Sequence, residues 1–147
     1  MVDSVEWREM IPNRDPWLWI DDVVELTDST ISAQKYLSPD LPIFEGHYPG
    51  FPLLPGVVLC EACLEASAIL IAGLGVSTSG RVPVATGMNN VRFRRMVRPG
   101  DRLEIEVKLS DRIQDVFFLR GNVRVDGLLC ASLDFVTTAV PPPVSEE

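Results

Sequence analysis

Residues 44–72 combine a rigid loop with a long apolar run, and this stretch constrains the fold more than any other. Five of the ten residues from Gly46 to Pro55 are glycine or proline. Proline fixes φ and removes a backbone donor, so regular helix or strand is excluded there. Pro55 then opens a run without another glycine or proline between Gly56 and Gly73, which predicts a helix over about residues 56–74. Because the run is apolar on nearly every side, we expect this helix to be buried.

Three ionisable side chains in this stretch suggest an active site. His47, the only histidine of the chain, lies in the loop, and Glu61 and Glu65 interrupt the helix. A neutral imidazole near pH 7 suits a general base. Glu61 suits a general acid if burial among its apolar neighbours, Val57, Val58 and Leu64, keeps it protonated. The alternatives are a surface histidine in a rigid turn and a glutamate that pairs with an arginine.

The spacing of these residues resembles the signature of the 3-hydroxyacyl-[acyl-carrier-protein] dehydratases of the hot-dog fold. The run from His47 to Ala62 (HYPGFPLLPGVVLCEA) has the histidine, aromatic, proline and glycine positions of that signature, with an acid fourteen residues after the histidine. Residues 11–23 and 87–103 resemble the flanking segments of the same family. The resemblance therefore covers most of the chain.

The resemblance implies roles for individual residues. His47 and Glu61 would be the catalytic pair, and Gly56 would give a backbone contact to the thioester carbonyl. The N–H at Gly56 also lies at the predicted helix N-terminus, where free donors favour negative charge. A substrate-binding role is expected for a second set: Gly56, Tyr48, Val57 and Glu65. In the family, the histidine comes from one subunit and the acid from its dimer partner, and no metal or cofactor is needed.

The remaining sequence predicts strands, and hence an α+β protein. The expected strands cover residues 17–26, 30–37, 82–96, 103–109, 115–124 and 128–140. We expect bulges at Asp21–Asp22 and near Gly87 and Asn89–Asn90, and a hairpin turn at Asp126–Gly127. Pattern alone leaves several α+β topologies open. The resemblance selects the hot-dog fold: a curved antiparallel sheet of about six strands wrapped around one long central helix.

Length and composition bound the remaining possibilities. With 147 residues, we expect one domain over residues 1–147, with residues 141–147 as a frayed tail. The net charge of −8 argues against a nucleic acid partner. No apolar run reaches membrane-spanning length without Glu or Gly inside it, and the first ten residues lack the apolar stretch of a secretory signal. We therefore expect a cytoplasmic protein that does not contact a membrane.

The cysteines and the arginines can each be interpreted as structural residues or as functional residues. Cys60 and Cys63 form a C-x-x-C pair, but inside the apolar helix, so we expect packed thiols rather than a redox or zinc site. A basic patch on this acidic chain could be solvated charge, or could dock an acyl carrier protein or the phosphates of coenzyme A. Its members are Arg92, Arg94, Arg95, Arg98 and Arg102. In a strand Arg92 and Arg94 would share one face and Arg95 the other, so not all five can serve one surface.

Three positions depart from the family pattern. Glu65 replaces the usual glutamine, Asn13 a histidine and Asn90 a lysine. Glu61 and Glu65 are four residues apart and share a helix face, so the two carboxyl groups should titrate as a pair. Our hypothesis is that Glu65 helps to keep Glu61 protonated.

The departures leave three functions open. The chain could be a dehydratase for acyl carrier protein thioesters, a hot-dog thioesterase, or a non-catalytic acyl-binding subunit. In each case we expect a homodimer, with a trimer of dimers as the next assembly to consider.

Overall fold

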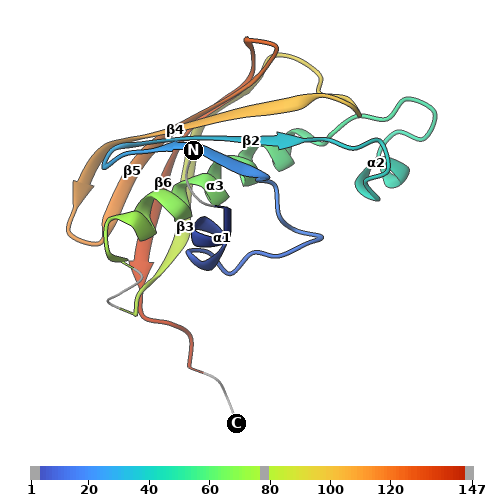
Figure 1. The fold of residues 1–147 in the computed structure, drawn as a ribbon. Helices are drawn as coiled ribbons and strands as arrows, with labels where there is room; N and C mark the ends of the chain where they lie inside the picture. Colours follow the sequence, from blue (N-terminus) through green and yellow to red (C-terminus); the bar gives the residue numbers. More distant parts are fainter. Residues whose placement is uncertain (1–3, 77–79, 145–147) are drawn as a thin grey trace.

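A curved antiparallel sheet wraps around one long helix (Figure 1). The computed structural model describes residues 4–76 and 80–144. The elements within these ranges are α1 (Ser4–Glu9), β1 (Asp22–Leu26), β2 (Thr30–Tyr36), α2 (Ile43–Gly46), α3 (Gly56–Gly73), β3 (Val82–Phe93), β4 (Arg102–Ile113), β5 (Val116–Val125) and β6 (Leu128–Val140). The strand order is β1-β2-β4-β5-β6-β3, and every pair is antiparallel. The predicted hot-dog architecture, with six strands and one central helix, is confirmed.

Helix α3 forms the centre of the hydrophobic core. Its buried residues include Ala62, Ala66 and Ile69, which have no exposed surface. The sheet approaches closely at Gly121 of β5, where a Cβ atom would lie 2.7 Å from Cys63 Sγ. By length and hydropathy α3 could cross a membrane, but 61% of it is buried inside the protein, as expected of a core helix.

The three cysteines are packing residues. Cys60, Cys63 and Cys130 are buried and free of disulfides. Burial raises the pKa of Cys63 far above its ordinary value, so this thiol stays protonated and unreactive. The prediction that the C-x-x-C pair consists of packed thiols is confirmed.

Most strand bounds and turns follow the predictions, but β4 extends to Ile113 rather than ending at residue 109, and there are three further differences. The Asp126–Gly127 turn joins β5 to β6 with positive φ at both residues, 52° and 77°. The bulges in β3 lie between Ala85 and Gly87 and between residues 89 and 92, as predicted. In β1, however, the bulge lies between residues 23 and 25 rather than at the acidic pair. The strand after α3 ends at Phe93 rather than at residue 96.

The third difference is that the first strand begins at Asp22 rather than at residue 17. The backbone N–H of Trp19 bonds to the side chain of Glu65 instead of to a neighbouring strand. The Asp21 carboxylate is also bound, to Lys35 Nζ at 3.1 Å and to the Tyr36 N–H at 2.7 Å. A side chain thus takes the place of a strand partner at Trp19, and backbone bonding to β2 begins only at Asp21, whose N–H donates to the Gln34 carbonyl.

The short helices α1 and α2 were not predicted. Trp7 anchors α1 because its side chain is fully buried. One hydrophobic core extends from Trp7 to Ala139, and a single domain over residues 1–147 remains our proposal. The predicted frayed tail falls partly on residues 145–147, which lie outside the described residues. Residues 141–144 are exposed and lack regular structure.

Candidate active site

The loop after α2 holds His47 in one orientation. Its Nδ1 atom lies 2.9 Å from the carbonyl oxygen of Leu53. A carbonyl oxygen can only accept, so Nδ1 carries the hydrogen and Nε2 keeps a free lone pair. The Tyr48 ring packs edge-on against the imidazole, with 4.7 Å between centroids. His47 is half-buried, and its Nε2 is therefore the atom that can act as a base.

His47 shares a hollow of about 630 Å³ with the start of α3. Gly56 and Val57 line the same hollow, and as the first residues of α3 their N–H groups have no acceptor within the helix. A Cβ atom on residue 56 would lie 3.0 Å from the Phe93 ring, which explains why a glycine stands there. A base and unpaired donors at a helix N-terminus thus border one space, where negative charge is stabilised.

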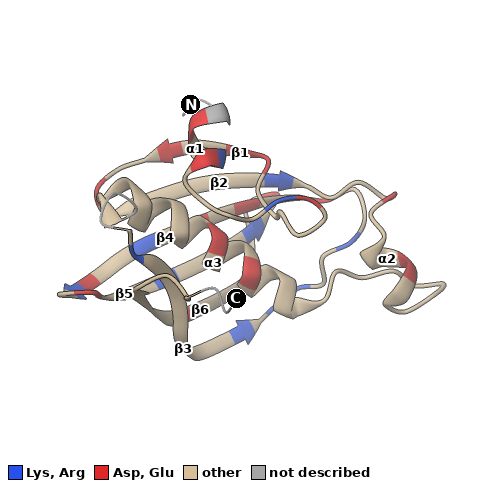
Figure 2. Cartoon of the chain, turned by 90° about the horizontal axis from the view of Figure 1, so that it is seen from below, with Lys and Arg blue, Asp and Glu red and all other residues tan. Residues whose placement is uncertain are grey.

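Glu61 and Glu65 line a second hollow, of about 240 Å³, together with Asn13. Figure 2 shows acidic positions on successive turns of α3. Glu65 is 2% exposed, and its Oε1 accepts a hydrogen bond of 2.8 Å from the Trp19 N–H. Glu61 is half-buried, and its Oε1 accepts a hydrogen bond of 3.0 Å from the indole N–H of Trp17.

The two carboxyl groups interact, and the pKa of the buried one, Glu65, is raised. Burial raises the pKa of Glu65 to about 8. The Trp19 N–H lowers the pKa because it stabilises the charged form, whereas the charge and hydrogen bond of Glu61 raise it, and Lys35 lowers it. As a carboxylate Glu65 would leave Oε2 buried without a hydrogen-bond partner among the described residues. As a carboxylic acid, Glu65 has a proton that it can share with the Glu61 carboxyl, the group that also raises its pKa.

This geometry corrects one expectation about the acid. We predicted that Glu61 would be buried among Val57, Val58 and Leu64. Val57 is 69% exposed, and the fully buried carboxyl belongs to Glu65, one helical turn further along. The predicted coupling of the two carboxyl groups stays a prediction, and it is supported by the charge of Glu61, which raises the pKa of Glu65.

Within one chain, the predicted site residues fall into two groups. His47, Gly56 and Val57 line the first hollow, with Tyr48 against the imidazole. The catalytic candidates His47 and Glu61 line different hollows.

The arginines of the basic patch also fall into two groups. Arg94 and Arg95 both line the hollow of His47, whereas Arg92 and Arg98 do not. The expected alternation of Arg94 and Arg95 is wrong because β3 ends at Phe93, so the next residues do not follow a strand pleat.

Trp17 is a site residue that the sequence did not reveal. Its indole N–H reaches a residue 44 positions away in the sequence. The sequence offered one indication of this contact: Trp17 follows a proline turn, and the indole N–H of a partly buried tryptophan usually donates a hydrogen bond.

Comparisons with known proteins agree on one family. The family model of ApeI-like dehydratases, described as ApeI dehydratase, matches residues 23–128. The chain is 35% identical to the 3-hydroxyacyl-[acyl-carrier-protein] dehydratase FabZ of Clostridium perfringens, over 90% of this chain and 94% of that protein. It is 38% identical to FabZ of Oleidesulfovibrio alaskensis, over 95% of this chain and 92% of the relative.

A solved structure supports the fold. The dehydratase heterocomplex ApeI:P from Xenorhabdus doucetiae superimposes with a TM-score of 0.78 at 17% identity, covering 93% of this chain and 91% of that chain. At this identity the likeness shows the hot-dog fold alone.

Glu65→Gln should reduce the pH dependence of folding stability. In the folded protein the pKa of Glu65 is about 8, against 4.5 ordinarily, so the folded state binds more protons than the unfolded state between these values. The free energy of unfolding of the unmodified protein should therefore fall as pH rises from about 5 to 8, by at most about 1.4 kcal/mol per pH unit for one proton. Glutamine still accepts from the Trp19 N–H but does not ionise. Denaturant unfolding at several pH values measures how the free energy of unfolding changes with pH in the unmodified protein and in Glu65→Gln.

The control is Glu9→Gln, which removes a carboxyl group at an exposed position of α1. It should leave the change of unfolding free energy with pH as it is in the unmodified protein. Equal slopes for the unmodified protein and Glu65→Gln would contradict the assignment of the buried proton to Glu65. We also expect Glu65→Gln to remain active, with the alkaline limb of its pH–rate profile at lower pH, because the pair no longer shares a proton.

Proposed function

Because the chain belongs to the 3-hydroxyacyl-[acyl-carrier-protein] dehydratase family, we propose that it removes water from a 3-hydroxyacyl thioester on acyl carrier protein and forms the trans-2-enoyl thioester. The reaction would serve fatty-acid or related acyl-chain synthesis in the cytoplasm. The observation that carries this proposal is the position of His47. His47, whose Nδ1 is bound to Leu53, lines the same hollow as Gly56 and Val57, whose N–H groups have no acceptor within α3.

Each chemical step has a matching group. Nε2 of His47 removes the proton at C2, and the electron pair moves toward the thioester carbonyl. The N–H groups of Gly56 and Val57 stabilise the negative charge on the carbonyl oxygen. Glu61 gives the proton that it shares with Glu65 to the C3 hydroxyl, the C–O bond breaks, and water leaves. These steps use only side chains and backbone of the protein.

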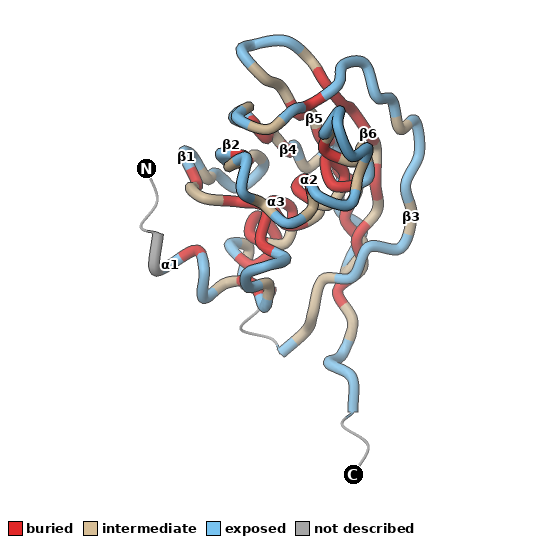
Figure 3. The backbone as a smooth tube through the Cα atoms, turned by 90° about the vertical axis from the view of Figure 1, so that its right-hand side faces the viewer, coloured by how far each residue is buried: buried red, intermediate tan, exposed pale blue. Residues whose placement is uncertain are grey.

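We propose a homodimer in which each site combines His47 of one subunit with Glu61 of the other. The separation of the two residues into different hollows of one chain supports this arrangement. The edge strand β3 is a suitable contact surface, since Val84, Met88 and Phe93 are exposed on it and Figure 3 shows the strand largely exposed. A trimer of dimers is the next assembly to test. The solved neighbour is a heterocomplex, so an unlike partner is the competing arrangement.

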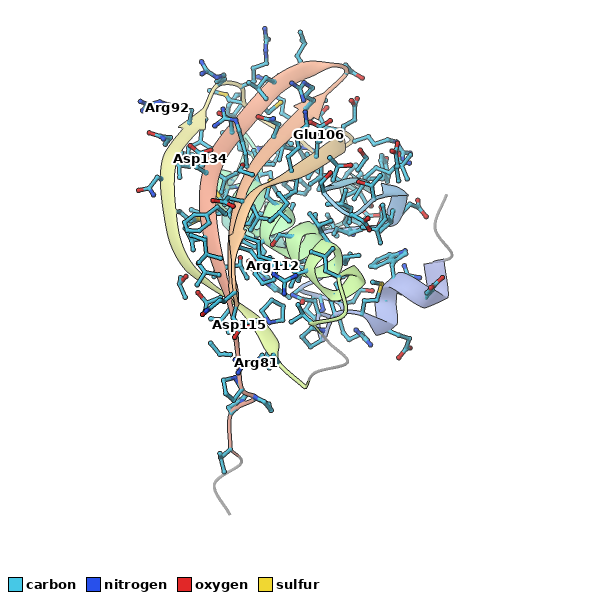
Figure 4. The ribbon with its side chains drawn as sticks, turned by 90° about the vertical axis from the view of Figure 1, so that its left-hand side faces the viewer. Arg81, Arg92, Glu106, Arg112, Asp115 and Asp134 are labelled. Atoms are coloured by element: carbon cyan, nitrogen blue, oxygen red, sulfur yellow. The ribbon has the colours of Figure 1, made fainter. Side chains whose placement is uncertain are left out.

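We propose Arg94 and Arg95 as the dock for the anionic carrier. Both are exposed, border the hollow of His47, and have no salt-bridge partner among residues 4–76 and 80–144. Arg98 instead lies over the Phe51 ring. Figure 4 shows Arg92 at the outer side of β3, near Asp134 and away from α3. Arg92 therefore offers a control, because it is an arginine close in sequence that does not line the hollow of His47.

Charge reversal of the dock should weaken binding of the carrier. We expect Arg94→Glu with Arg95→Glu to raise KM for acyl carrier protein or coenzyme A thioesters about tenfold or more at low salt, with a smaller effect at high salt. Arg92→Glu should change KM little. The KM for a short thioester that lacks a phosphate group reports on the same active site without a carrier. An equal loss for that substrate would mean that the arginines act on the acyl group and not on the carrier.

One assay tests the proposed function against its alternatives. The protein is incubated with 3-hydroxyacyl and 2-enoyl thioesters, and enoyl absorbance and free thiol are followed together. The expected result is a change in enoyl absorbance while the thioester bond stays intact. Release of free thiol would indicate a thioesterase, and binding without either change would indicate an acyl-binding subunit. The burial and raised pKa of Glu65 argue against a thioesterase, which needs an ionised carboxylate that contacts water.

A further inference from the structure

The segment from Trp17 to Trp19 contacts both carboxyl groups of the site. Trp17 donates from its indole to Glu61, and Trp19 donates from its backbone to Glu65. The two indole rings pack edge-to-face, with 5.6 Å between centroids. Trp19 is buried, so it anchors the segment, whereas Trp17 is 50% exposed and extends to the site. Two residues of one loop therefore hold two acids of one helix.

The Trp17 hydrogen bond restricts Glu61 in two ways. A half-buried glutamate has several side-chain rotamers, and a bond of 3.0 Å to a ring fixed against Trp19 selects among them. The bond also occupies Oε1 of Glu61. Because an N–H can only donate, a proton on Glu61 is then carried by Oε2.

We propose that Trp17 is a positioning residue for the reaction: its indole N–H binds Oε1 of Glu61 and so leaves Oε2 as the oxygen that exchanges a proton with the substrate. This inference rests on the proposed role of Glu61 as the acid. Trp17 acts through Glu61 and need not touch the reacting atoms. Its contribution should therefore appear in turnover rather than in substrate binding.

A different role for Trp17 has to be distinguished. The residue also lines an apolar hollow of about 420 Å³ with Trp19 and Leu41. If Trp17 served only as a wall for an acyl chain, its loss would raise KM and would do so more for long chains. If it orients Glu61, its loss lowers kcat for short and long substrates alike.

The chain supplies a control in Trp7, which lies in α1. The indole Nε1 of Trp7 has no hydrogen-bond partner among the described residues, whereas the indole of Trp17 is bonded to Glu61. Trp17→Phe and Trp7→Phe thus make the same chemical change, and only the first removes a hydrogen bond to an acid. We expect Trp17→Phe to lower kcat about tenfold with little change in KM, and Trp7→Phe to leave kcat near that of the unmodified protein.

A double-mutant cycle tests the route of the effect. Glu61→Asp withdraws the carboxyl group from the indole, so Trp17→Phe should cost little in that background. An equal tenfold loss in the Asp background, or a loss confined to KM, would overturn the proposal. Activity of the unmodified protein in the same assay reports separately on the proposed function.

A spectroscopic measurement does not depend on turnover. The protein has three tryptophans and therefore three indole N–H resonances, and Trp17→Phe identifies the one from Trp17. In Glu61→Gln this resonance should move, while those of Trp7 and Trp19, whose indoles lack partners in the described structure, should not. An unmoved Trp17 resonance would contradict the hydrogen bond itself, even if the enzyme proved to catalyse another reaction.

Discussion

Replacing His47 by alanine is expected to reduce kcat/KM by ~10²-fold or more, the scale of a general base. The fold and assembly should persist, because His47 lies half-buried in a loop, where its contacts are one hydrogen bond to Leu53 and one ring contact with Tyr48. Steady-state turnover of a 3-hydroxyacyl thioester measures the loss. Circular dichroism and gel filtration check that the protein is intact.

His47→Gln separates the two functions of the imidazole. Glutamine can still donate a hydrogen bond to the Leu53 carbonyl, but it cannot remove a proton at neutral pH. We expect a loss as large as in His47→Ala. Turnover close to that of the unmodified protein in either variant would end the assignment of Nε2 as the base.

The central helix and the hairpins could be predicted because local chemistry decides them. Pro55 and Gly56 start α3, an apolar run without a breaker continues it, and Asp126–Gly127 supplies the positive φ values of the β5–β6 turn. The start of β1 could not be predicted in the same way. The sequence at residues 17–21 has strand-like residues, but its backbone and side chains are bound by Glu65, Lys35 and the β2 backbone, which are distant in sequence.

The sequence predicts the residue types of the candidate site but not their arrangement. The spacing of His47, Gly56 and Glu61 follows a recognisable signature, and the structure places His47 and Gly56 around one hollow. Which carboxyl is buried depends on the side of α3 that faces the Trp17–Trp19 segment. That packing raises the pKa of Glu65, and no periodicity of the helix itself distinguishes Glu65 from Glu61, since both lie on the same face.

The partition of His47 and Glu61 between two hollows predicts complementation between two inactive proteins. His47→Ala and Glu61→Gln should each be inactive alone. After subunit exchange, a mixed dimer has one site with both substitutions and one site with an intact His47 and an intact Glu61. An equal mixture at random exchange contains half mixed dimers, each with one working site of two. We therefore expect recovery of about a quarter of the unmodified activity.

The measurement is turnover of the mixture before and after exchange, with mixed dimers isolated by two different affinity tags. A mixture of His47→Ala with His47→Gln is the control, because every site then lacks the base and no activity should return. Proven exchange without recovery would place the base and the acid on one chain, and the loop of His47 would then have to move toward Glu61 for catalysis. Recovery only on addition of an unlike dehydratase subunit would favour a heterocomplex, since the intact partner of each site would then come from a different protein.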